Sequence, residues 1–362
     1  MSPNYLKFIN EAHKIAKKNF GNSFPNPVVG CLIAKKNKLI SKAVTNISGR
    51  PHAEEIALKK AGKRATGATM YVTLEPCFHN SINGSCVDQI LRAGIKEIYI
   101  STKDPDKRTN SKSIKKLKLN KVNVIYGLHE EKTLLLNKFF FHSIKNKRPY
   151  TKIKMAISKD QKIAWKNYKS KWISNSKSRE YAHYLRSKSQ AILTTSKTII
   201  KDNPRFTIRI KDKKIKHLPI IIIDNSLNTP INSRVMNERH NKRIIIFTFT
   251  KNKLKVNKFV TLGCEVIIFK KNSKGYMSLK KIFKKLYLLK ISDLLVEAGG
   301  IFFSNLIYER LVDEIHLFQA EFDIGKKGIP MLINKKISDL DLMLIKKKKI
   351  TNNYYYKYSV LK

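Results

Sequence analysis

Apolar residues in the first third of the chain follow two different spacings. Between residues 4 and 19 they recur every three or four positions, which predicts an amphipathic helix. Two short apolar runs, at 28–34 and 39–44, predict strands. Further helices are predicted at residues 51–61, 86–93 and 130–141, and further strands at 68–74, 97–101 and 122–126. This alternation predicts a mixed α/β sandwich, in which a mostly buried sheet carries helices on both faces.

The pattern is interrupted by the short basic segment Lys145-Asn146-Lys147-Arg148-Pro149. Because a chain of 362 residues is long enough for two domains, we place a boundary here and expect domains at residues 1–145 and 146–362. In the second part, strands are predicted at residues 150–157, 191–193, 220–223, 243–247, 266–269, 293–296, 314–319 and 354–360. Helices are predicted there at residues 177–188, 279–289 and 301–309. These elements predict a second α/β domain.

The charge of the chain is strongly unbalanced, because 74 Lys and Arg residues against 26 Asp and Glu residues give a formal net charge of +48. Taken alone, this charge favours a polyanionic partner. The lysines, however, occur along the whole chain, and the run Lys346 to Lys349 lacks the interleaved aromatic residues of RNA-binding modules. We interpret the charge as a compositional drift toward Lys, Asn and Ile, and we expect no nucleic acid as partner. The charge would favour the alternative, a tRNA- or RNA-binding protein with a deaminase fold.

The cysteine content and the apolar segments indicate the compartment. Four cysteines in 362 residues do not make a disulfide framework, which fits a reducing environment. Cys31 and Cys264 lie in apolar runs and are expected to be buried. The first twenty residues lack the apolar core of a signal peptide, and no apolar stretch reaches the roughly 18 residues needed to span a bilayer. We therefore expect a cytoplasmic protein with no membrane partner.

Candidate metal chemistry lies between residues 50 and 86. The segment Pro51-His52-Ala53-Glu54 precedes Thr73-Leu74-Glu75-Pro76-Cys77, and Cys86 follows nine positions later. One histidine and two cysteines can hold a catalytic zinc, because three protein ligands leave the fourth tetrahedral position open for water. Glu54 lies two residues after His52 and is expected to place a carboxylate beside the metal. In zinc nucleobase deaminases a glutamate in this position of the motif moves protons. A closed structural zinc site with His79 as the fourth ligand is the alternative.

The second domain offers two weaker signals. Arginines cluster around one predicted helix and the turn that follows it, in a chain that otherwise prefers lysine: Arg179, Arg186, Arg205 and Arg209. Arginine binds phosphate bidentately, although a solvated basic face would look the same in the sequence. Gly299-Gly300 follows a predicted strand and opens a helix, a turn that can present backbone N–H groups to a pyrophosphate. An ordinary strand-to-helix turn explains these glycines equally well.

Three N-terminal motifs occur in a distinctive order: Phe24-Pro25-Asn26-Pro27-Val28-Val29-Gly30, Pro51-His52-Ala53-Glu54 and Thr73-Leu74-Glu75-Pro76-Cys77. With the nine-residue step to Cys86, they resemble the deaminase half of the bifunctional riboflavin-biosynthesis deaminase/reductase family. The resemblance implies a cytidine-deaminase-like three-layer domain. It also implies that His52, Cys77 and Cys86 hold one Zn2+ per chain, that Glu54 is the proton shuttle and that Asn26 helps to hold the pyrimidine.

Motifs of the second domain follow the order of the same family's reductase: Ser170-Lys171-Trp172-Ile173-Ser174, His183-Tyr184-Leu185-Arg186, Asp202-Asn203-Pro204 and Val296-Glu297-Ala298-Gly299. The resemblance implies a dihydrofolate-reductase-like α/β domain that uses NADPH. It implies NADPH contacts from Ala156, Trp172, Thr198, Asp202, Gly299 and Gly300. It implies substrate contacts from Ser170, Arg186, Phe206, Arg209 and Glu297, with the arginines on the phosphate of the substrate.

Some positions depart from the family pattern. Phe206 replaces the usual leucine, and Gln161 replaces the glycine of a Ser-x-Asp-Gly motif. The segment between Cys77 and Cys86 lacks the arginine and the two prolines that the family usually has there.

The resemblance implies a bifunctional enzyme of riboflavin biosynthesis. Its first domain would deaminate the phosphorylated aminopyrimidine 2,5-diamino-6-(5-phosphoribosylamino)pyrimidin-4-one by hydrolysis. Its second domain would use NADPH to reduce the ribosyl group of the product to ribityl. A deaminase with an impaired reductase domain is the alternative. We also expect a homo-oligomer, either a dimer or a tetramer.

Overall fold

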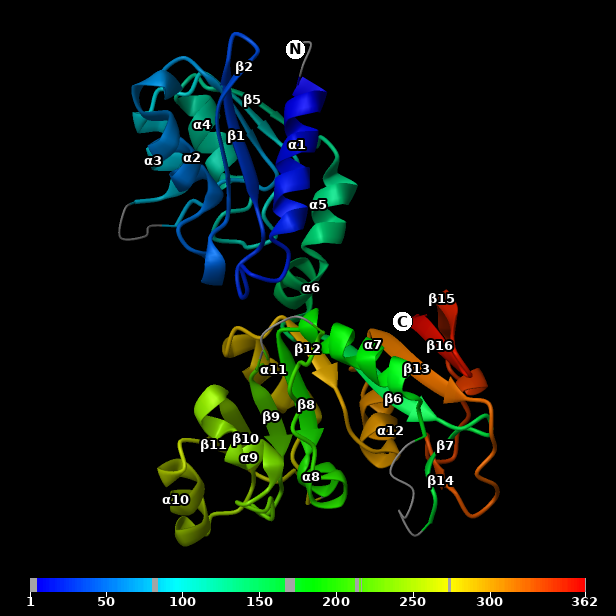
Figure 1. The fold of residues 1–362 in the computed structure, drawn as a ribbon. Helices are drawn as coiled ribbons and strands as arrows, with labels where there is room; N and C mark the ends of the chain where they lie inside the picture. The colour runs from blue at the N-terminus through cyan, green and yellow to red at the C-terminus, as the bar shows by residue number, and fades with distance from the viewer. Residues whose placement is uncertain are drawn as a thin grey trace. The chain divides into compact units, whose positions relative to one another are not determined.

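The computed structural model describes residues 5–79, 84–166, 173–211, 215, 217–272 and 275–361. The expected contacts Ser170 and Trp172 lie outside the described residues. The chain forms two compact units, Met1–Lys147 and Arg148–Lys362 (Figure 1). The residues expected to bind zinc belong to the first unit, and those expected to bind NADPH belong to the second.

The N-terminal unit is built on a five-stranded sheet with the order β2-β1-β3-β4-β5. Its strands are β1 (Gly30–Lys35), β2 (Lys38–Val44), β3 (Thr69–Val72), β4 (Glu97–Ile100) and β5 (Asn123–Tyr126). β1 pairs antiparallel with β2 and β3, whereas β3, β4 and β5 run parallel. Parallel neighbours need crossover connections, and helices supply them here.

Helices cover both faces of this sheet (Figure 1). They are α1 (Tyr5–Lys18), α2 (Ala53–Ala61), α3 (Cys86–Arg92), α4 (Lys112–Leu119), α5 (Glu130–Leu136) and α6 (Lys138–Asn146). On one face, α1 buries Phe8 and Ile9 against Tyr71 and Tyr99 of the sheet. On the other face, α2, α3 and α4 bury aliphatic side chains against β1, β3 and β4. The predicted sandwich with helices on both faces is confirmed.

One predicted helix of this unit is wrong, because residues 130–141 belong to two helices that meet at Asn137. The backbone of Asn137 has φ −110° and ψ 24°, outside the helical range. Its side chain accepts a hydrogen bond of 2.8 Å from the Val28 N–H and donates one of 3.0 Å to the Val28 carbonyl. The helix is therefore interrupted where Asn137 contacts a distant segment of the chain. The spacing of apolar residues does not reveal such a contact. The helix predicted from Pro51 begins at Ala53, with His52 as its N-cap.

The C-terminal unit is built on a nine-stranded sheet with the order β11-β10-β9-β8-β12-β6-β13-β16-β15. Its strands are β6 (Tyr150–Ile157), β8 (Ala191–Thr195), β9 (Ile220–Ile223), β10 (Ile244–Thr248), β11 (Glu265–Ile268), β12 (Asp293–Val296), β13 (Glu314–Ala320), β15 (Leu342–Ile350) and β16 (Asn353–Val360). The strands from β11 to β13 are parallel, and β16 and β15 continue the sheet antiparallel. A separate ribbon pairs β7 (Lys162–Ala164) with β14 (Ile329–Pro330).

Helices bury apolar side chains on both faces of this second sheet. They are α7 (Ser176–Ser187), α8 (Ser196–Asp202), α9 (Arg234–Asn237), α10 (Lys253–Thr261), α11 (Leu279–Leu288) and α12 (Gly300–Tyr308). Phe283 of α11 and Phe303 of α12 belong to one core, whereas Met236 of α9 and Phe259 of α10 belong to another. The predicted second α/β domain is confirmed. Short 3-10 helices also occur in the chain: η1 (Ile47–Gly49), η2 (Gly62–Ala65), η3 (Arg239–Asn241) and η4 (Ile337–Asp339).

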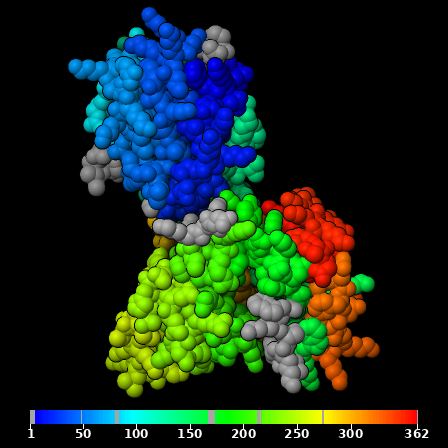
Figure 2. Space-filling view, viewed as in Figure 1, coloured from blue at the N-terminus to red at the C-terminus, as the bar shows by residue number. Residues whose placement is uncertain are grey.

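Strand β15 was not predicted, although it forms one edge of the nine-stranded sheet. Seven of its nine residues are exposed, so it shows no alternation of buried and exposed positions. Its pairing with β16 depends on backbone hydrogen bonds instead, and the hairpin lies at the surface of the C-terminal unit (red in Figure 2). Among the described residues, no helix has the length and apolar character needed to cross a membrane.

Candidate active sites

Three potential metal ligands meet in the N-terminal unit. His52 is the N-cap of α2, Cys86 is the first residue of α3, and Cys77 follows the end of β3. One ligand atom from each of them lies within 4.8 Å of the others. The sheet and two helix starts thus bring together the three residues expected to hold zinc.

The chemistry of this cluster fits a zinc ion. His52 Nδ1 lies 3.2 Å from Cys86 Sγ, and the Cys86 N–H donates to Cys77 Sγ at 3.3 Å. Mainly because of its hydrogen bond with the Cys86 side chain, the pKa of Cys77 falls to about 4, so a thiolate forms readily. Two sulfur donors and one imidazole are a preferred donor set for zinc. Within the described part of the chain, His79 is not a member of the cluster, so it offers no fourth ligand.

Glu54 lies in the first turn of α2, two residues after His52, and only 3% of its surface is exposed. Burial raises the pKa of this carboxyl group above its ordinary value. A buried carboxylic acid beside a metal site can hold and return a proton without exchange with bulk water. This placement suits the proton shuttle that the sequence suggested.

A second buried carboxylate, Glu75, has a role that the sequence analysis missed. Its oxygens accept backbone hydrogen bonds from Asp104 (3.2 Å), Ser111 (3.0 Å) and Ile114 (3.4 Å). Glu75 therefore ties the strand exit that carries Cys77 to the start of α4. The signal was available, because a glutamate two residues before a metal ligand in a buried strand exit needs a partner.

Asn26 is tied to the loop that leads to His52. Its side-chain amide donates to the Gly49 carbonyl at 3.1 Å. A Cβ atom at Gly49 would lie 2.5 Å from the Asn26 side chain, and the φ of Gly49 is +88°. Only glycine suits this position, so the loop is shaped around Asn26.

The C-terminal unit contains a cavity of about 580 Å³ at the carboxyl ends of β8 and β12, beside β6. Its wall includes eight of the expected residues: Ala156, Arg186, Thr198, Asp202, Phe206, Glu297, Gly299 and Gly300. Ligands of open α/β sheets bind at this end of parallel strands. Arg209 is expected at the same site but does not line the cavity.

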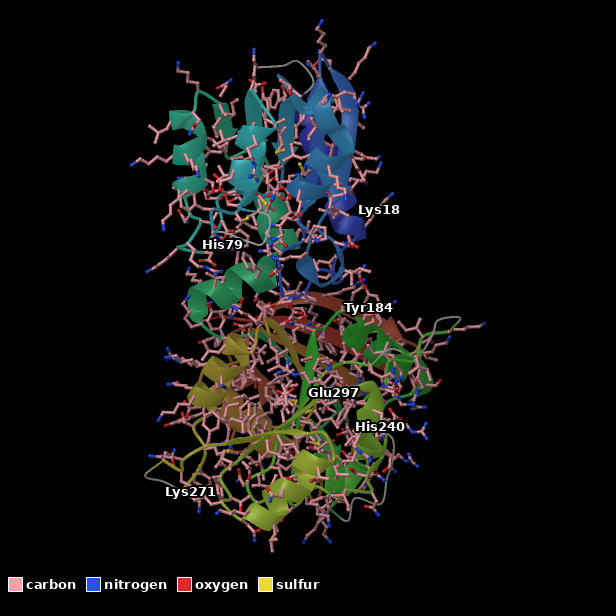
Figure 3. The ribbon with its side chains drawn as sticks, turned by 90° about the vertical axis from the view of Figure 1, so that its left-hand side faces the viewer. Lys18, His79, Tyr184, His240, Lys271 and Glu297 are labelled. Atoms are coloured by element: carbon pink, nitrogen blue, oxygen red, sulfur yellow. The ribbon has the colours of Figure 1, made fainter. Side chains whose placement is uncertain are left out.

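Glu297 is the charged centre of this cavity and lies within the C-terminal unit (Figure 3). Arg186 donates from Nε to Oε1 at 2.6 Å and from Nη2 to Oε2 at 3.0 Å, and Lys154 Nζ lies 2.9 Å from Oε2. Burial alone would raise the pKa of Glu297, but the charges of Arg186 and Lys154 outweigh it and hold the pKa well below its ordinary value. Glu297 is therefore an ionised hydrogen-bond acceptor.

Lys154 is a cavity residue that the sequence analysis missed. The available signal was a lysine between two apolar residues of a predicted strand, Ile153-Lys154-Met155. The contact itself depends on the pairing of β6 with β12, which brings Ile153 opposite Val296, the residue before Glu297.

The two arginines expected on the phosphate differ in their surroundings. The fork of Arg186 is occupied by Glu297, and its remaining nitrogen donates to the Thr207 carbonyl at 3.2 Å. Arg209 is exposed, and among the described residues no carboxylate pairs with it. Of the two arginines, Arg209 is therefore the one whose guanidinium group is not paired with a carboxylate among the described residues.

Phe206 and Gly300 show how tightly the cavity wall is built. The Phe206 backbone has a φ of 53°, its side chain is buried, and its ring centroid lies 5.8 Å from Arg186 Cζ. A Cβ atom at Gly300 would lie 2.6 Å from the Pro330 carbonyl oxygen, whereas a Cβ atom at Gly299 would meet nothing within 4 Å. Gly300 is therefore needed for packing, and Gly299 leaves open space toward the cavity.

Two family profiles match the chain, one in each unit. A profile described as "Cytidine and deoxycytidylate deaminase zinc-binding region" matches residues 3–102, and one described as "RibD C-terminal domain" matches residues 149–356. The first match contains the three-ligand cluster, and the second contains the cavity. The matches confirm the expected order of a cytidine-deaminase-like domain followed by a reductase-type domain.

Known proteins align with this chain over most of their length and of its own. "Riboflavin biosynthesis protein RibD" from Aquifex aeolicus is 36% identical over 355 residues, covering 96% of this chain and 95% of the relative. The protein of that name from Escherichia coli is 30% identical, covering 88% of each chain. A solved deaminase/reductase from Thermotoga maritima is 28% identical, with a TM-score of 0.80 and 99% coverage of both chains. A solved RibD from Acinetobacter baumannii has a TM-score of 0.87 and 99% coverage of both chains at 24% identity, which concerns the fold alone.

Proposed function

This chain belongs to the RibD family of bifunctional riboflavin-biosynthesis deaminase/reductases, and we propose how its own residues divide the two reactions. It is an enzyme with hydrolase and oxidoreductase activities that uses Zn2+ and NADPH and acts on a phosphorylated aminopyrimidine. We propose 2,5-diamino-6-(5-phosphoribosylamino)pyrimidin-4-one as the compound that is deaminated. A single observation carries the assignment of residues: ligand atoms of His52, Cys77 and Cys86 lie within 4.8 Å of one another. The buried Glu54 follows the first of these ligands by two positions.

In the deaminase domain, we assign one zinc ion to His52, Cys77 and Cys86. Zinc, when bound there, activates a water molecule for attack on the carbon that carries the amino group. Glu54 takes a proton from the attacking water and delivers protons to the ring nitrogen and the leaving amine, which is general acid–base catalysis. We assign Asn26 to the pyrimidine, because its side chain is held beside the loop that leads to His52.

In the reductase domain, we assign NADPH to the cavity wall formed by Ala156, Thr198, Asp202, Gly299 and Gly300. NADPH, when bound, supplies the hydride that converts the open-chain ribosyl carbon into a ribityl carbon. Trp172 as a cofactor contact and Ser170 as a substrate contact are proposed from the family resemblance alone.

Substrate binding in the reductase domain is assigned to four residues. Glu297 accepts hydrogen bonds from the aminouracil, because Arg186 and Lys154 keep it ionised. Phe206 supplies an apolar wall for the ring. Arg209 binds the phosphate, since its guanidinium group is exposed and faces no carboxylate among the described residues. Arg186 acts on the substrate chiefly by orienting Glu297.

We also propose that the protein is a cytoplasmic homo-oligomer. The two zinc-binding thiols must stay reduced, which fits the cytoplasm. The edge strand β15 exposes about half of the surface of each of the apolar residues Met343, Leu344 and Ile345. An edge strand of this kind needs cover, and a second copy of the chain would supply it. Nucleic acid and membranes are not part of the proposed function.

The test is to incubate purified protein with the substrate, with and without NADPH, and to follow ammonia release and NADPH oxidation separately. We expect ammonia release without NADPH, and NADPH oxidation only after deamination. Ammonia release without NADPH oxidation would favour a deaminase with an impaired reductase domain. Salt-sensitive RNA binding without ammonia release would favour the RNA-binding alternative.

A further inference from the structure

The imidazole of His183 lies between the two arginines of the reductase site. His183 Nδ1 is 3.0 Å from the Thr207 carbonyl oxygen, and His183 Nε2 is 3.4 Å from Arg209 Nη2. Arg186 Nη1 donates to the same Thr207 carbonyl at 3.2 Å. His183 is 9% exposed and belongs to α7, one turn before Arg186.

Two donors also approach Nδ1, the Arg209 backbone N–H at 3.2 Å and Arg186 Nη1 at 3.5 Å. We assign the hydrogen of the neutral imidazole to Nδ1, because the contact with the Thr207 carbonyl is the shortest of the three at 3.0 Å. In this tautomer the Nε2 lone pair accepts from the Arg209 guanidinium. Burial lowers the pKa of His183 to about 4, and the charges of Arg186 and Arg209 act in the same direction. A neutral side chain is what this position requires, because an imidazolium would repel both guanidinium groups.

Arg209 differs from Arg186 in what holds it. Arg186 is fixed by two hydrogen bonds to Glu297. Arg209 is exposed, and among the described residues its guanidinium makes two contacts, both long, to His183 Nε2 at 3.4 Å and to Thr207 Oγ1 at 3.4 Å. A long side chain that is free to rotate loses conformational entropy when it binds an anion, so a contact that orients it beforehand strengthens binding.

We propose that His183 is a positioning residue that aims the Arg209 guanidinium at the phosphate of the reductase substrate. The inference rests on the proposed function in one respect, the assignment of Arg209 to the phosphate. His183 itself need not touch substrate or NADPH. Its effect should therefore appear in the KM of the substrate and not in the kcat of hydride transfer.

The chain offers a matched pair of variants. In His183→Gln, the amide oxygen can replace Nε2 as the acceptor for Arg209. In His183→Asn, the amide can replace Nδ1 as the donor to Thr207 but cannot reach Arg209. We expect His183→Asn to raise the reductase KM about tenfold, the effect of losing one hydrogen bond to a charged group, with kcat nearly unchanged. We expect His183→Gln to retain a KM close to that of the wild type.

The variants are measured in the full chain with the deaminated substrate and NADPH, and ammonia release from the deaminase substrate serves as an internal control. A double-mutant cycle with Arg209→Ala completes the test. If His183 acts through Arg209, His183→Asn should have no further effect on KM in the Arg209→Ala background.

The outcomes separate two kinds of failure. If Arg209→Ala raises KM but His183→Asn does not, the positioning role is overturned and the phosphate assignment stands. If Arg209→Ala leaves KM unchanged, the phosphate assignment falls and the positioning role falls with it. Equal losses of kcat and melting temperature in both His183 variants would show a structural role and overturn the inference.

Discussion

Glu297 and Arg186, which are 111 positions apart in the chain, form a two-pronged ion pair with N–O distances of 2.6 and 3.0 Å. Their side chains are only 8% and 14% exposed. A third charge, Lys154, lies 2.9 Å from the second Glu297 oxygen. Removing the carboxylate would leave two buried cations without a partner, and this cost is much larger than the gain from an exposed ion pair.

We therefore predict that Glu297→Gln destabilises the C-terminal unit by about 3 kcal/mol at neutral pH. Denaturant unfolding followed by tryptophan fluorescence measures this unit, because both tryptophans of the chain, Trp165 and Trp172, belong to it. The matched control is Glu309→Gln, which removes an exposed pair with Lys280 at 3.4 Å and should cost less than about 1 kcal/mol. Equal effects of the two substitutions would contradict the prediction.

The ion pair of Glu297 and Arg186 also predicts that the stability of the folded protein depends on pH. The pKa of Glu297 is depressed in the folded protein, so its contribution to stability is present above the ordinary carboxyl value of 4.5 and is lost as pH falls below it. The stability difference between wild type and Glu297→Gln should therefore shrink when unfolding is measured at decreasing pH below 4.5. A difference that grows on acidification would mean that Glu297 is not held ionised by its neighbours.

Glu54→Gln should lower ammonia release by at least about a hundredfold, because the amide cannot shuttle a proton. Zinc content should not change, since Glu54 is not among the three clustered ligands. NADPH oxidation with the deaminated substrate should also be unaffected. The neighbouring substitution Glu55→Gln is the control and should retain ammonia release; similar losses in both variants would point to damage to α2 in place of a missing proton shuttle.

Apolar periodicity was sufficient for most elements, but not for those determined by distant contacts. The run Ile220 to Ile223 and the segment Asp293 to Val296 form strands with the predicted bounds because they are buried in the middle of the sheet. The break at Asn137 depends on hydrogen bonds to Val28, which lies 109 positions away. The edge strand β15 has little side-chain burial, so no hydrophobic pattern marks it.

The cluster of His52, Cys77 and Cys86 was predictable because local motifs carry these residues, whereas the partners of Glu297 were not predictable. Glu54 follows His52 by two positions, so one motif contains both a ligand and a carboxylate. Lys154 reaches Glu297 only because β6 pairs with β12 in the observed register. The sequence also suggested that Arg186 binds phosphate, but the fold places its fork on Glu297.

Gln161 shows a departure from the family that the structure explains. The family has glycine at this position, and the Gln161 backbone has a φ of 60°, in the left-handed region that favours glycine. Three hydrogen bonds hold the residue there. Its N–H donates to the Ser158 carbonyl at 3.1 Å, the Met331 N–H donates to its carbonyl at 3.0 Å, and the Ile337 N–H donates to its Oε1 at 3.2 Å. The side chain thus makes a contact that glycine could not make, which offsets part of the backbone strain.

Removal of zinc should abolish ammonia release and leave NADPH oxidation unchanged. Cys77→Ser should lose bound zinc and ammonia release, because serine replaces a thiolate in a three-ligand set. Dialysis of the wild-type protein against a chelator should have the same effect, with NADPH oxidation of the deaminated substrate retained. Cys31→Ala is the control, since Cys31 is buried in β1 outside the cluster and should keep its zinc. Full zinc content in Cys77→Ser, measured by elemental analysis, would remove Cys77 from the ligand set.

The two adjacent glycines at the start of α12, Gly299 and Gly300, are expected to contribute to different properties, one to NADPH binding and the other to stability, and alanine at each position tests this. At Gly300, a Cβ atom would lie 2.6 Å from the Pro330 carbonyl oxygen and 2.7 Å from that of Met331, so Gly300→Ala should destabilise the C-terminal unit by about 1–3 kcal/mol. At Gly299, the added Cβ atom meets nothing within 4 Å and the φ is −77°, so stability should change by less than about 0.5 kcal/mol.

If the Gly299 backbone approaches the pyrophosphate of NADPH closely, Gly299→Ala should nevertheless raise the NADPH Kd about tenfold, because the methyl group would occupy that space. Titration of the protein into NADPH, followed by nucleotide fluorescence, measures this Kd, and an unchanged value would exclude Gly299 from the proposed cofactor contacts.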